Sequence, residues 1–264
     1  MEKATSTDGT TIAYDVRGTG PLVVVVGGAF NDRNTGAELA GVLADDGFTA
    51  VSYDRRGRGD SGSTEPYAVE REIEDLAAVI ATAGGGGPGY AHGVSSGGAL
   101  LLRAAAAGVP LARISVLEPP YRVSGAPPAP ADYIATLQGY VDAGDRDGLV
   151  EYFQTQVVGL PSEMVQSFRG TPMWRALCAM APTLVNDGLC LGGDDHSLPV
   201  DLLASVRVPV LAVTSSGTAA PWLAETAQHV ASALPAGEWV RLDGGFHEVP
   251  PATLAPALAA FYRG

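Results

Sequence analysis

The stretch Gly93-Val94-Ser95-Ser96-Gly97-Gly98 is the most informative part of this sequence. An apolar run over residues 89–94 precedes the serine, and an Ala- and Leu-rich stretch of helical period over residues 96–107 follows it. A strand, a tight turn and a helix are therefore predicted in this order. Glycines in such a turn avoid collisions with neighbouring backbone, and the serine lies at the positive end of the helix. Ser95 is the predicted nucleophile. Ser96 is the rival by residue type, but only Ser95 has a glycine two residues away on both sides.

The alternation of strand and helix continues on both sides of this stretch. Short β-branched runs alternate with Ala- and Leu-rich segments, which predicts an α/β fold with a mostly parallel sheet. Residues 23–26 are four consecutive valines, so we expect this strand to be covered on both faces. The predicted strands cover residues 11–16, 22–26, 48–53, 89–94, 113–117, 208–214 and 238–242, and the predicted helices cover 35–45, 68–83, 96–107, 220–234 and 251–262.

The alternation stops between Pro119 and Pro199. After a proline-rich entry, helical patterns occur near residues 131–143, 147–158, 162–169 and 173–185, with no convincing strand. We interpret residues 121–199 as an inserted helical cap between two parts of one core, residues 1–120 and 200–264. Most apolar residues of the cap would form its own core. A minority would face the sheet as an apolar lid that favours bulky substrates, with Tyr121, Met173 and Trp174 as candidate contacts.

Composition limits the possible partners. The chain has 264 residues, 46% of them hydrophobic, and a net charge of −13. Spread acidic charge opposes binding to nucleic acid or to an anionic membrane surface. The longest uncharged apolar run, residues 22–30, is far shorter than the roughly 20 residues that span a bilayer, and no signal peptide is recognisable, so we expect a cytoplasmic protein. Cys178 and Cys190 are expected to be buried thiols, since they have neither metal-ligand spacing nor a disulfide framework.

Two motifs together resemble the α/β-hydrolase superfamily. The serine stretch has the form Gly-x-Ser-x-Gly between a strand and a helix. The stretch Tyr53-Asp54-Arg55-Arg56-Gly57-Arg58-Gly59-Asp60-Ser61 is similar to the Asp-x-Arg-Gly-x-Gly-x-Ser sequence that follows the fourth strand in this superfamily. The resemblance covers nearly all of the chain and implies the α/β-hydrolase fold. Asp54, Arg55 and Arg56 are expected to brace their loop rather than contact a substrate.

A serine hydroxyl needs a base to become a good nucleophile at neutral pH, and histidine suits this task. His247 follows the last predicted strand and precedes the terminal helix, which is where the resemblance implies the base. The other histidines have structural interpretations. His92 is predicted to be packed in the core, His196 to lie in a cap loop and His229 to lie on a helix surface.

The resemblance also implies an oxyanion hole. The matching loop is Gly27-Gly28-Ala29-Phe30, which lacks the usual histidine. Ala29 and Ser96 would supply the two backbone N–H groups, and such donors act through backbone geometry. Phe30 and Asn31 are expected at the mouth of the pocket, in contact with substrate.

The position of the acid departs from most of the superfamily. The strand over residues 208–214 and the six residues after it contain no carboxylate. Glu118 ends the preceding strand, just before Pro119 and Pro120, and the zearalenone lactonases are among the members that have their acid there. Because the prolines turn the chain out of the sheet, Glu118 would point into the crevice at the carboxyl ends of the strands. The rival acid is Asp243.

These residues predict acyl transfer. Ser95, His247 and Glu118 would hydrolyse an apolar ester or lactone through an acyl-enzyme, with no metal and no cofactor. The resemblance to zearalenone lactonases makes a macrolactone one candidate. Two alternatives stay open: another enzyme class, such as a perhydrolase, lyase or cyclase, and a ligand-binding descendant. The sequence gives no oligomeric state.

Overall fold

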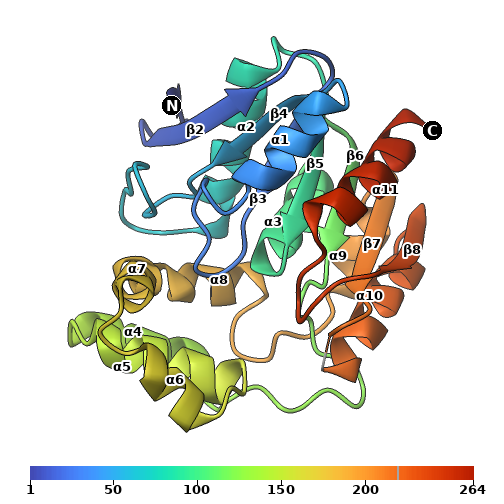
Figure 1. The fold of residues 1–264 in the computed structure, drawn as a ribbon. Coiled ribbons are helices and arrows are strands. Elements are labelled where there is room, and N and C mark those ends of the chain that lie inside the picture. Colours follow the sequence, from blue (N-terminus) through green and yellow to red (C-terminus); the bar gives the residue numbers. More distant parts are fainter. Residues whose placement is uncertain (219) are drawn as a thin grey trace.

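One sheet of eight strands runs through the molecule in the computed structural model, which describes residues 1–218 and 220–264 (Figure 1). The strand order is β1-β2-β4-β3-β5-β6-β7-β8. The pairs β1–β2 and β2–β4 are antiparallel and the other pairs are parallel. The strands are β1 (Glu2–Thr5), β2 (Thr11–Arg17), β3 (Leu22–Val26), β4 (Thr49–Tyr53), β5 (Gly89–Val94), β6 (Leu111–Leu117), β7 (Val210–Ser215) and β8 (Gly237–Leu242).

Helices cover both faces of this sheet. Val24 and Val26 of β3 belong to the core formed with α2, α3, α9 and α10, whereas Val23 and Val25 belong to the core formed with α1 and α11. The valine run is therefore buried on both faces, as its lack of polar alternation predicted. These helices are α1 (Ala37–Asp45), α2 (Val69–Ala83), α3 (Ser96–Ala106), α9 (Val200–Ser205), α10 (Pro221–Ala233) and α11 (Pro251–Arg263).

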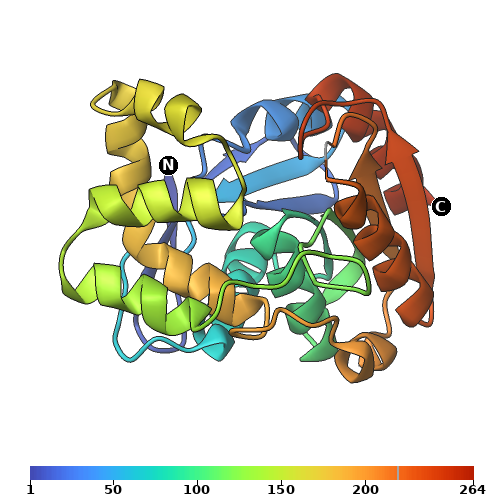
Figure 2. The same ribbon diagram turned by 90° about the horizontal axis from the view of Figure 1, so that it is seen from below.

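A run of short helices connects β6 to β7, and we call residues 121–199 the helical segment. It has an apolar core of its own, which includes Leu137, Leu149 and Leu184. Its helices lie below the sheet in Figure 1 and occupy one side of the molecule in the view from below (Figure 2). They are α4 (Tyr133–Asp142), α5 (Arg146–Tyr152), the π-helix η1 (Phe153–Val157), α6 (Ser162–Phe168), α7 (Pro172–Met180), the 3₁₀ helix η2 (Ala181–Thr183) and α8 (Leu184–Cys190).

The α/β-hydrolase fold predicted from the sequence is confirmed, but some elements differ. The edge strand β1 and the short helix α9 were not predicted, because each is too short to show a period. The helix predicted over residues 147–158 changes to a π-helix at Phe153. The helix predicted over 173–185 breaks at η2, which contains Pro182, and continues as α8 to Cys190.

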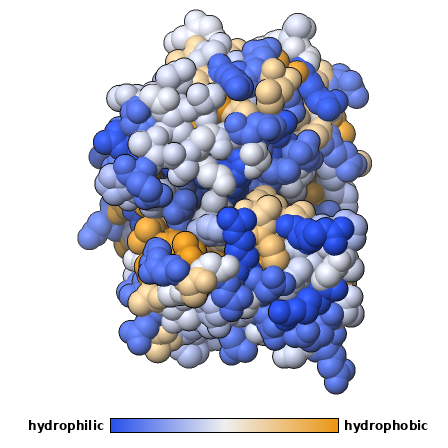
Figure 3. All heavy atoms as spheres, turned by 90° about the vertical axis from the view of Figure 1, so that its left-hand side faces the viewer, coloured by the Kyte–Doolittle hydropathy of each residue, from blue (hydrophilic) through white to orange (hydrophobic). Residues whose placement is uncertain are grey.

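One face of the molecular surface is mainly polar (Figure 3). On the face that lies to the left in Figure 1, hydrophilic residues predominate and apolar residues form only small groups (Figure 3). Among the described residues, no helix has the length and apolar character needed to cross a membrane.

Candidate active site

Ser95 occupies a tight turn between β5 and α3. Its φ is 56°, in the left-handed region that non-glycine residues rarely adopt. The glycines on either side are needed for space. A Cβ on Gly93 would lie 2.6 Å from the Gly97 carbonyl oxygen, and one on Gly97 would lie 2.5 Å from that of Val26. This close packing holds the Ser95 side chain at the carboxyl end of the sheet, at the start of a helix.

His247 and Glu118 meet at the same end of the sheet. His247 Nδ1 donates a hydrogen bond of 2.7 Å to Glu118 Oε2. The other oxygen, Oε1, accepts bonds from the Ser215 N–H at 2.8 Å and from the Thr218 hydroxyl at 2.6 Å. Every oxygen of this buried carboxylate therefore has a partner. Burial alone would raise the pKa of Glu118, but the bonds from His247, Thr218 and Ser215 outweigh it and lower the pKa, so the group is ionised at neutral pH.

Several residues of this site have positive φ values, which are strained for residues other than glycine. Ser95, Glu118 and His247 have φ values of 56°, 45° and 52°, and Phe30 has 58°. Non-glycine residues in this region cost free energy, and they persist where the surroundings fix the geometry. Strain at four residues of one site is typical of a preorganised functional site.

The competing candidates lie elsewhere. Asp243 is exposed, and its carboxylate makes no hydrogen bond or ion pair to His247 within the described part of the chain. His92 is fully buried in β5 against the Ser115 hydroxyl at 2.8 Å, as a core histidine would be. His196 is buried against Tyr133, and His229 is exposed on α10.

The loop after β3 faces the serine turn. A Cβ on Gly28 would lie 2.8 Å from the Val94 carbonyl oxygen, so the loop and the turn pack closely. Ser96 is the first residue of α3, and its N–H therefore has no acceptor inside the helix. Asn31 Oδ1 accepts a bond of 2.9 Å from the Gly28 N–H, so this side chain closes the loop. Ala29, which the sequence predicts as the second oxyanion donor, is the next residue of this loop after Gly28.

These loops and the helical segment enclose a cavity of about 610 Å³. Ser95, His247, Ala29, Phe30 and Asn31 all line it. The opposite wall comes from the π-helix η1, as a π-helix often does at functional sites. Phe30 and Phe153 both line the cavity and contact each other edge to face, with 5.4 Å between ring centroids. Further lining residues are Val94, Pro120, Arg122, Gln154, Gln156, Val157, Leu177, Trp222, Leu223 and Phe246.

Three of the residues predicted to contact substrate do not line this cavity. Tyr121 is 0% exposed and packs in the sheet's core. Trp174 is 3% exposed within the core of the helical segment, because a small helical layer must bury its own aromatic side chains. Met173, its neighbour on α7, is 49% exposed. The cavity therefore exposes none of these three side chains to a substrate, contrary to the prediction.

Arg55, Arg58, Glu72 and Asp187 form a buried network of ion pairs next to the site. Arg55 contacts Glu72 through two hydrogen bonds, and its Nη1 donates to Asp187 Oδ1 at 2.7 Å. Arg58 Nη2 contacts both oxygens of Asp187 at 2.8 Å, and its Nη1 donates to the carbonyl of Gly28. The Asp-x-Arg-like loop thus braces both the loop after β3 and the helical segment, and Arg55 and Arg58 contribute no side chain to the cavity lining.

The charges of this network compensate one another. Burial by itself would raise the pKa of Glu72 and of Asp187, but the adjacent guanidinium groups outweigh it and lower both pKa values. In the same way, Glu72 and Asp187 raise the pKa of Arg55 despite its burial. Arg55, Glu72 and Asp187 are therefore ionised, and removing one of them would leave an uncompensated buried charge.

Sequence reasoning missed several residues near the site. Asp187 gave no signal, because its ionic partners Arg55 and Arg58 lie more than a hundred residues away in the sequence. Arg122 follows the predicted acid closely, and a cation among prolines in an acidic chain was the available clue. Phe153 and Trp222 look like any aromatic residue of a helix core.

The fold and this arrangement define the class of the protein. Residues 22–259 match the alpha/beta hydrolase family, so the chain belongs to that family. An alpha/beta hydrolase from Sphaerobacter thermophilus DSM 20745 is 44% identical, covers 99% of this chain and 100% of its own, and superposes with a TM-score of 0.91.

Two further relatives are more distant. A thermophilic esterase from Thermogutta terrifontis, whose structure is malate-bound, is 24% identical with a TM-score of 0.74, over 99% of this chain and 97% of its own, and shows the fold alone. The uncharacterized hydrolase YraK of Bacillus subtilis (strain 168) is 37% identical over 92 residues, which are 34% of this chain and 33% of that relative's length. The match to YraK thus spans about a third of that curated relative.

Proposed function

We propose that this protein is a serine hydrolase that cleaves a carboxylic ester or lactone through an acyl-enzyme. Ser95 is the nucleophile, His247 the general base and Glu118 the acid that orients the imidazole. The observation that carries this proposal is the 2.7 Å bond between His247 Nδ1 and Glu118 Oε2, made by an imidazole that lines the same cavity as Ser95. A histidine held through Nδ1 keeps Nε2 available for the serine proton.

The proposed steps follow from this geometry. Ser95 Oγ attacks the carbonyl carbon while His247 takes the hydroxyl proton, and the N–H groups of Ala29 and Ser96 stabilise the oxyanion. The tetrahedral intermediate collapses, and the departing alkoxide takes the proton from His247. Water then attacks the acyl-enzyme with His247 again as base, which releases the acid and restores Ser95. These steps need neither a metal ion nor an organic cofactor.

The cavity favours a substrate with an apolar body. Phe30, Phe153, Val157, Leu177 and Leu223 supply apolar walls, and about 610 Å³ is enough for a drug-sized molecule. A macrolactone of the kind implied by the resemblance to zearalenone lactonases remains one candidate within this class.

Turnover of p-nitrophenyl esters with short to medium acyl chains tests the proposal directly. Wild type is expected to hydrolyse them, and Ser95→Ala and His247→Ala are expected to lose nearly all turnover while they keep the wild-type circular dichroism spectrum. Hydrolysis that survives in Ser95→Ala would refute Ser95 as nucleophile. No hydrolysis by wild type would favour the lyase or ligand-binding alternatives.

A further inference from the structure

Arg122 lies in the wall of the cavity with unused hydrogen-bond donors. It follows β6 and Glu118, and its backbone N–H donates to the His196 carbonyl at 2.8 Å, which fixes the backbone here. Its Nε and Nη1 atoms are buried and have no hydrogen-bond partner in residues 1–218 and 220–264. A buried charged donor without a partner is costly, so such a group in a cavity wall indicates a ligand that completes it.

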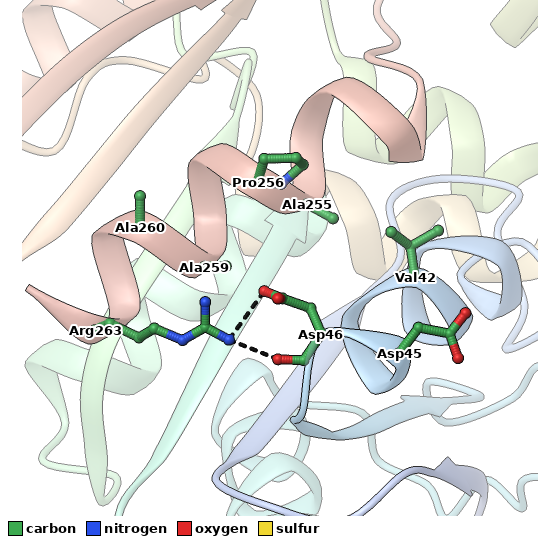
Figure 4. Close-up of a pocket in the computed structure, with 8 residues that line it drawn as sticks. All are labelled: Val42, Asp45, Asp46, Ala255, Pro256, Ala259, Ala260 and Arg263. Carbon is green, nitrogen blue, oxygen red and sulfur yellow. Dashed lines mark hydrogen bonds and ion pairs between the residues drawn. The ribbon is translucent and has the colours of Figure 1, made fainter.

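Four other arginines, three of them buried, are paired with carboxylates. Arg55, Arg56 and Arg58 each contact a buried carboxylate. Arg263 borders a shallow hollow between α1 and α11, where it binds both the carboxylate and the backbone carbonyl of Asp46 (Figure 4). Those guanidinium groups have no donor fork left for a ligand, whereas Arg122 does.

The charge around Arg122 is also unusual. The chain carries a net charge of −13, yet the described residues that line the cavity include no Asp or Glu. Asp132, Asp194 and Asp195 border a shallow groove on the other side of Arg122, and none of them is within ion-pair distance of it. Burial lowers the pKa of Arg122, because no carboxylate counters it as Glu72 and Asp187 do for Arg55.

Trp222 lies beside the Arg122 guanidinium. The guanidinium carbon lies 5.8 Å from the centroid of the indole ring, which also lines the cavity. Beside this cation–π contact, Nε and Nη1 have no hydrogen-bond acceptor among the described residues. Two parallel N–H donors match the two oxygens of a carboxylate. A single guanidinium also suits a charge of −1 better than the larger charge of a phosphate.

We propose that Arg122 forms a carboxylate-binding subsite of the active-site cavity. The substrate is then an ester or lactone that carries a free carboxylate on an otherwise apolar body. This inference rests on the proposed function and narrows its substrate class. Ser95 and His247 act on the ester carbonyl as described above, while Arg122 holds the remote carboxylate and takes part in no bond change.

Matched esters test this subsite. Mono-p-nitrophenyl adipate and suberate each carry a carboxylate where p-nitrophenyl hexanoate and octanoate have a terminal methyl group. Wild type is expected to show a higher kcat/KM for the anionic member of at least one pair, by roughly tenfold or more. Arg122→Gln is expected to abolish this ratio, whereas Arg122→Lys is expected to retain part of it because the charge remains but the fork is lost.

The control is Arg175→Gln, which removes the same charge from an exposed position on α7 of the helical segment. It should leave the anionic-to-neutral ratio as in wild type. Hydrolysis of both members of each pair with equal kcat/KM would overturn the subsite, and so would a preference that persists in Arg122→Gln. The first of these results would also be expected if Arg122 turns to pair with Asp194 or Asp195.

Binding separates this inference from the proposed function. Calorimetric titration with adipate measures the subsite without any turnover. If wild type hydrolyses no ester but binds adipate, and Arg122→Gln does not, the subsite is supported while the proposed hydrolysis fails. If wild type neither hydrolyses the esters nor binds adipate, both are refuted.

Discussion

The hydroxyl of Ser96 donates a hydrogen bond of 2.6 Å to Oδ1 of Asp187. This bond joins the first residue of α3, directly after the candidate nucleophile, to α8 of the helical segment. Arg55 Nη1 also donates to the Ser96 hydroxyl at 3.2 Å. The side chain of Ser96 is thus a structural connection, while its backbone N–H is the proposed oxyanion donor.

Ser96→Ala is expected to destabilise the protein by about 2 kcal/mol, because a buried carboxylate loses one of its donors. The loss of kcat should be much smaller than in Ser95→Ala, since the backbone N–H remains. Urea unfolding and ester turnover measure the two effects. Ser232→Ala on the exposed side of α10 is the control and should change the free energy of unfolding by less than about 0.5 kcal/mol. Equal losses of unfolding free energy in Ser96→Ala and Ser232→Ala would contradict a structural role for the bond between Ser96 and Asp187.

Asp187→Asn should destabilise the protein more strongly, by about 3–5 kcal/mol, because Arg55 and Arg58 would keep buried charges with too few partners. Combined with Ser96→Ala in a double-mutant cycle, it should show a coupling of roughly 0.5–3 kcal/mol. Additive effects on the free energy of unfolding would mean that the two side chains act independently.

Glu118→Gln is expected to lower kcat by about 100- to 10,000-fold, since the amide neither stabilises an imidazolium nor fixes the tautomer of His247. Asp243→Asn should leave kcat within about twofold, because Asp243 is exposed and unbonded to His247. Steady-state kinetics on one activated ester compare the two variants. A large loss in Asp243→Asn with little change in Glu118→Gln would assign the acid to the His247 loop instead.

Gly97→Ala should be strongly destabilising, by about 3 kcal/mol or more, because its Cβ would lie 2.5 Å and 2.6 Å from the carbonyl oxygens of Val26 and Gly27. Both atoms belong to backbone that cannot move without displacing the end of β3 and the loop after it. In contrast, Gly139→Ala on exposed α4 has no atom within 4 Å of the added Cβ and should stabilise by roughly 0.5–1 kcal/mol. Thermal unfolding of the two variants measures this difference in sign.

Two buried histidines make the stability depend on pH. Burial lowers the pKa of His92 and of His196 from 6.5 to about 4. Between these values the unfolded chain binds protons that the folded protein does not, so stability is complete above pH 6.5 and falls as the pH drops toward 4. Each histidine contributes up to about 1.4 kcal/mol per pH unit.

Urea unfolding between pH 4.5 and 7.5 tests this expectation through its slope. His92→Gln removes one histidine that takes up a proton on unfolding, so it should reduce the slope of the unfolding free energy against pH by the share of that histidine. This holds whatever the substitution does to stability at pH 7.5. The exposed histidine on α10 supplies the control, since His229→Gln should leave the slope unchanged. The lowered pKa values of Glu72, Glu118 and Asp187 act only at lower pH, as each carboxylate takes up a proton. A stability curve that is flat from pH 7.5 to 4.5 would contradict the burial of both rings in neutral form.

The sequence predicted the fold and the chain positions of the central site residues because both depend on local patterns. Strand and helix alternate with clear periods, and chemistry-bearing residues stand where predicted strands end. In a parallel sheet those ends converge, so Ser95 and Glu118, from neighbouring strands β5 and β6, meet at one edge. Their catalytic roles stay predictions until the variants are measured.

The lining of the cavity could not be predicted in the same way. It depends on which side of each short helix faces the sheet, and that is decided by packing over long sequence distances. Trp174 and Phe153 are both aromatic residues of the helical segment, yet one lies in its core and the other in the cavity wall. Composition alone suggested an apolar lid and gave no indication that Arg122 would lie unpaired beside it.

The cavity is lined partly by loops at strand ends and partly by the helical segment, and these two parts can change independently in evolution. Ser95, Glu118 and His247 belong to loops at strand ends, whereas η1 contributes a wall without touching their hydrogen bonds. Substitutions in Phe153–Val157 can therefore alter the lining of the cavity while the hydrogen bonds of the proposed catalytic residues stay unchanged. Asp187 limits such changes, because replacing the whole helical segment without this carboxylate would leave Arg55 and Arg58 unpaired close to the candidate nucleophile.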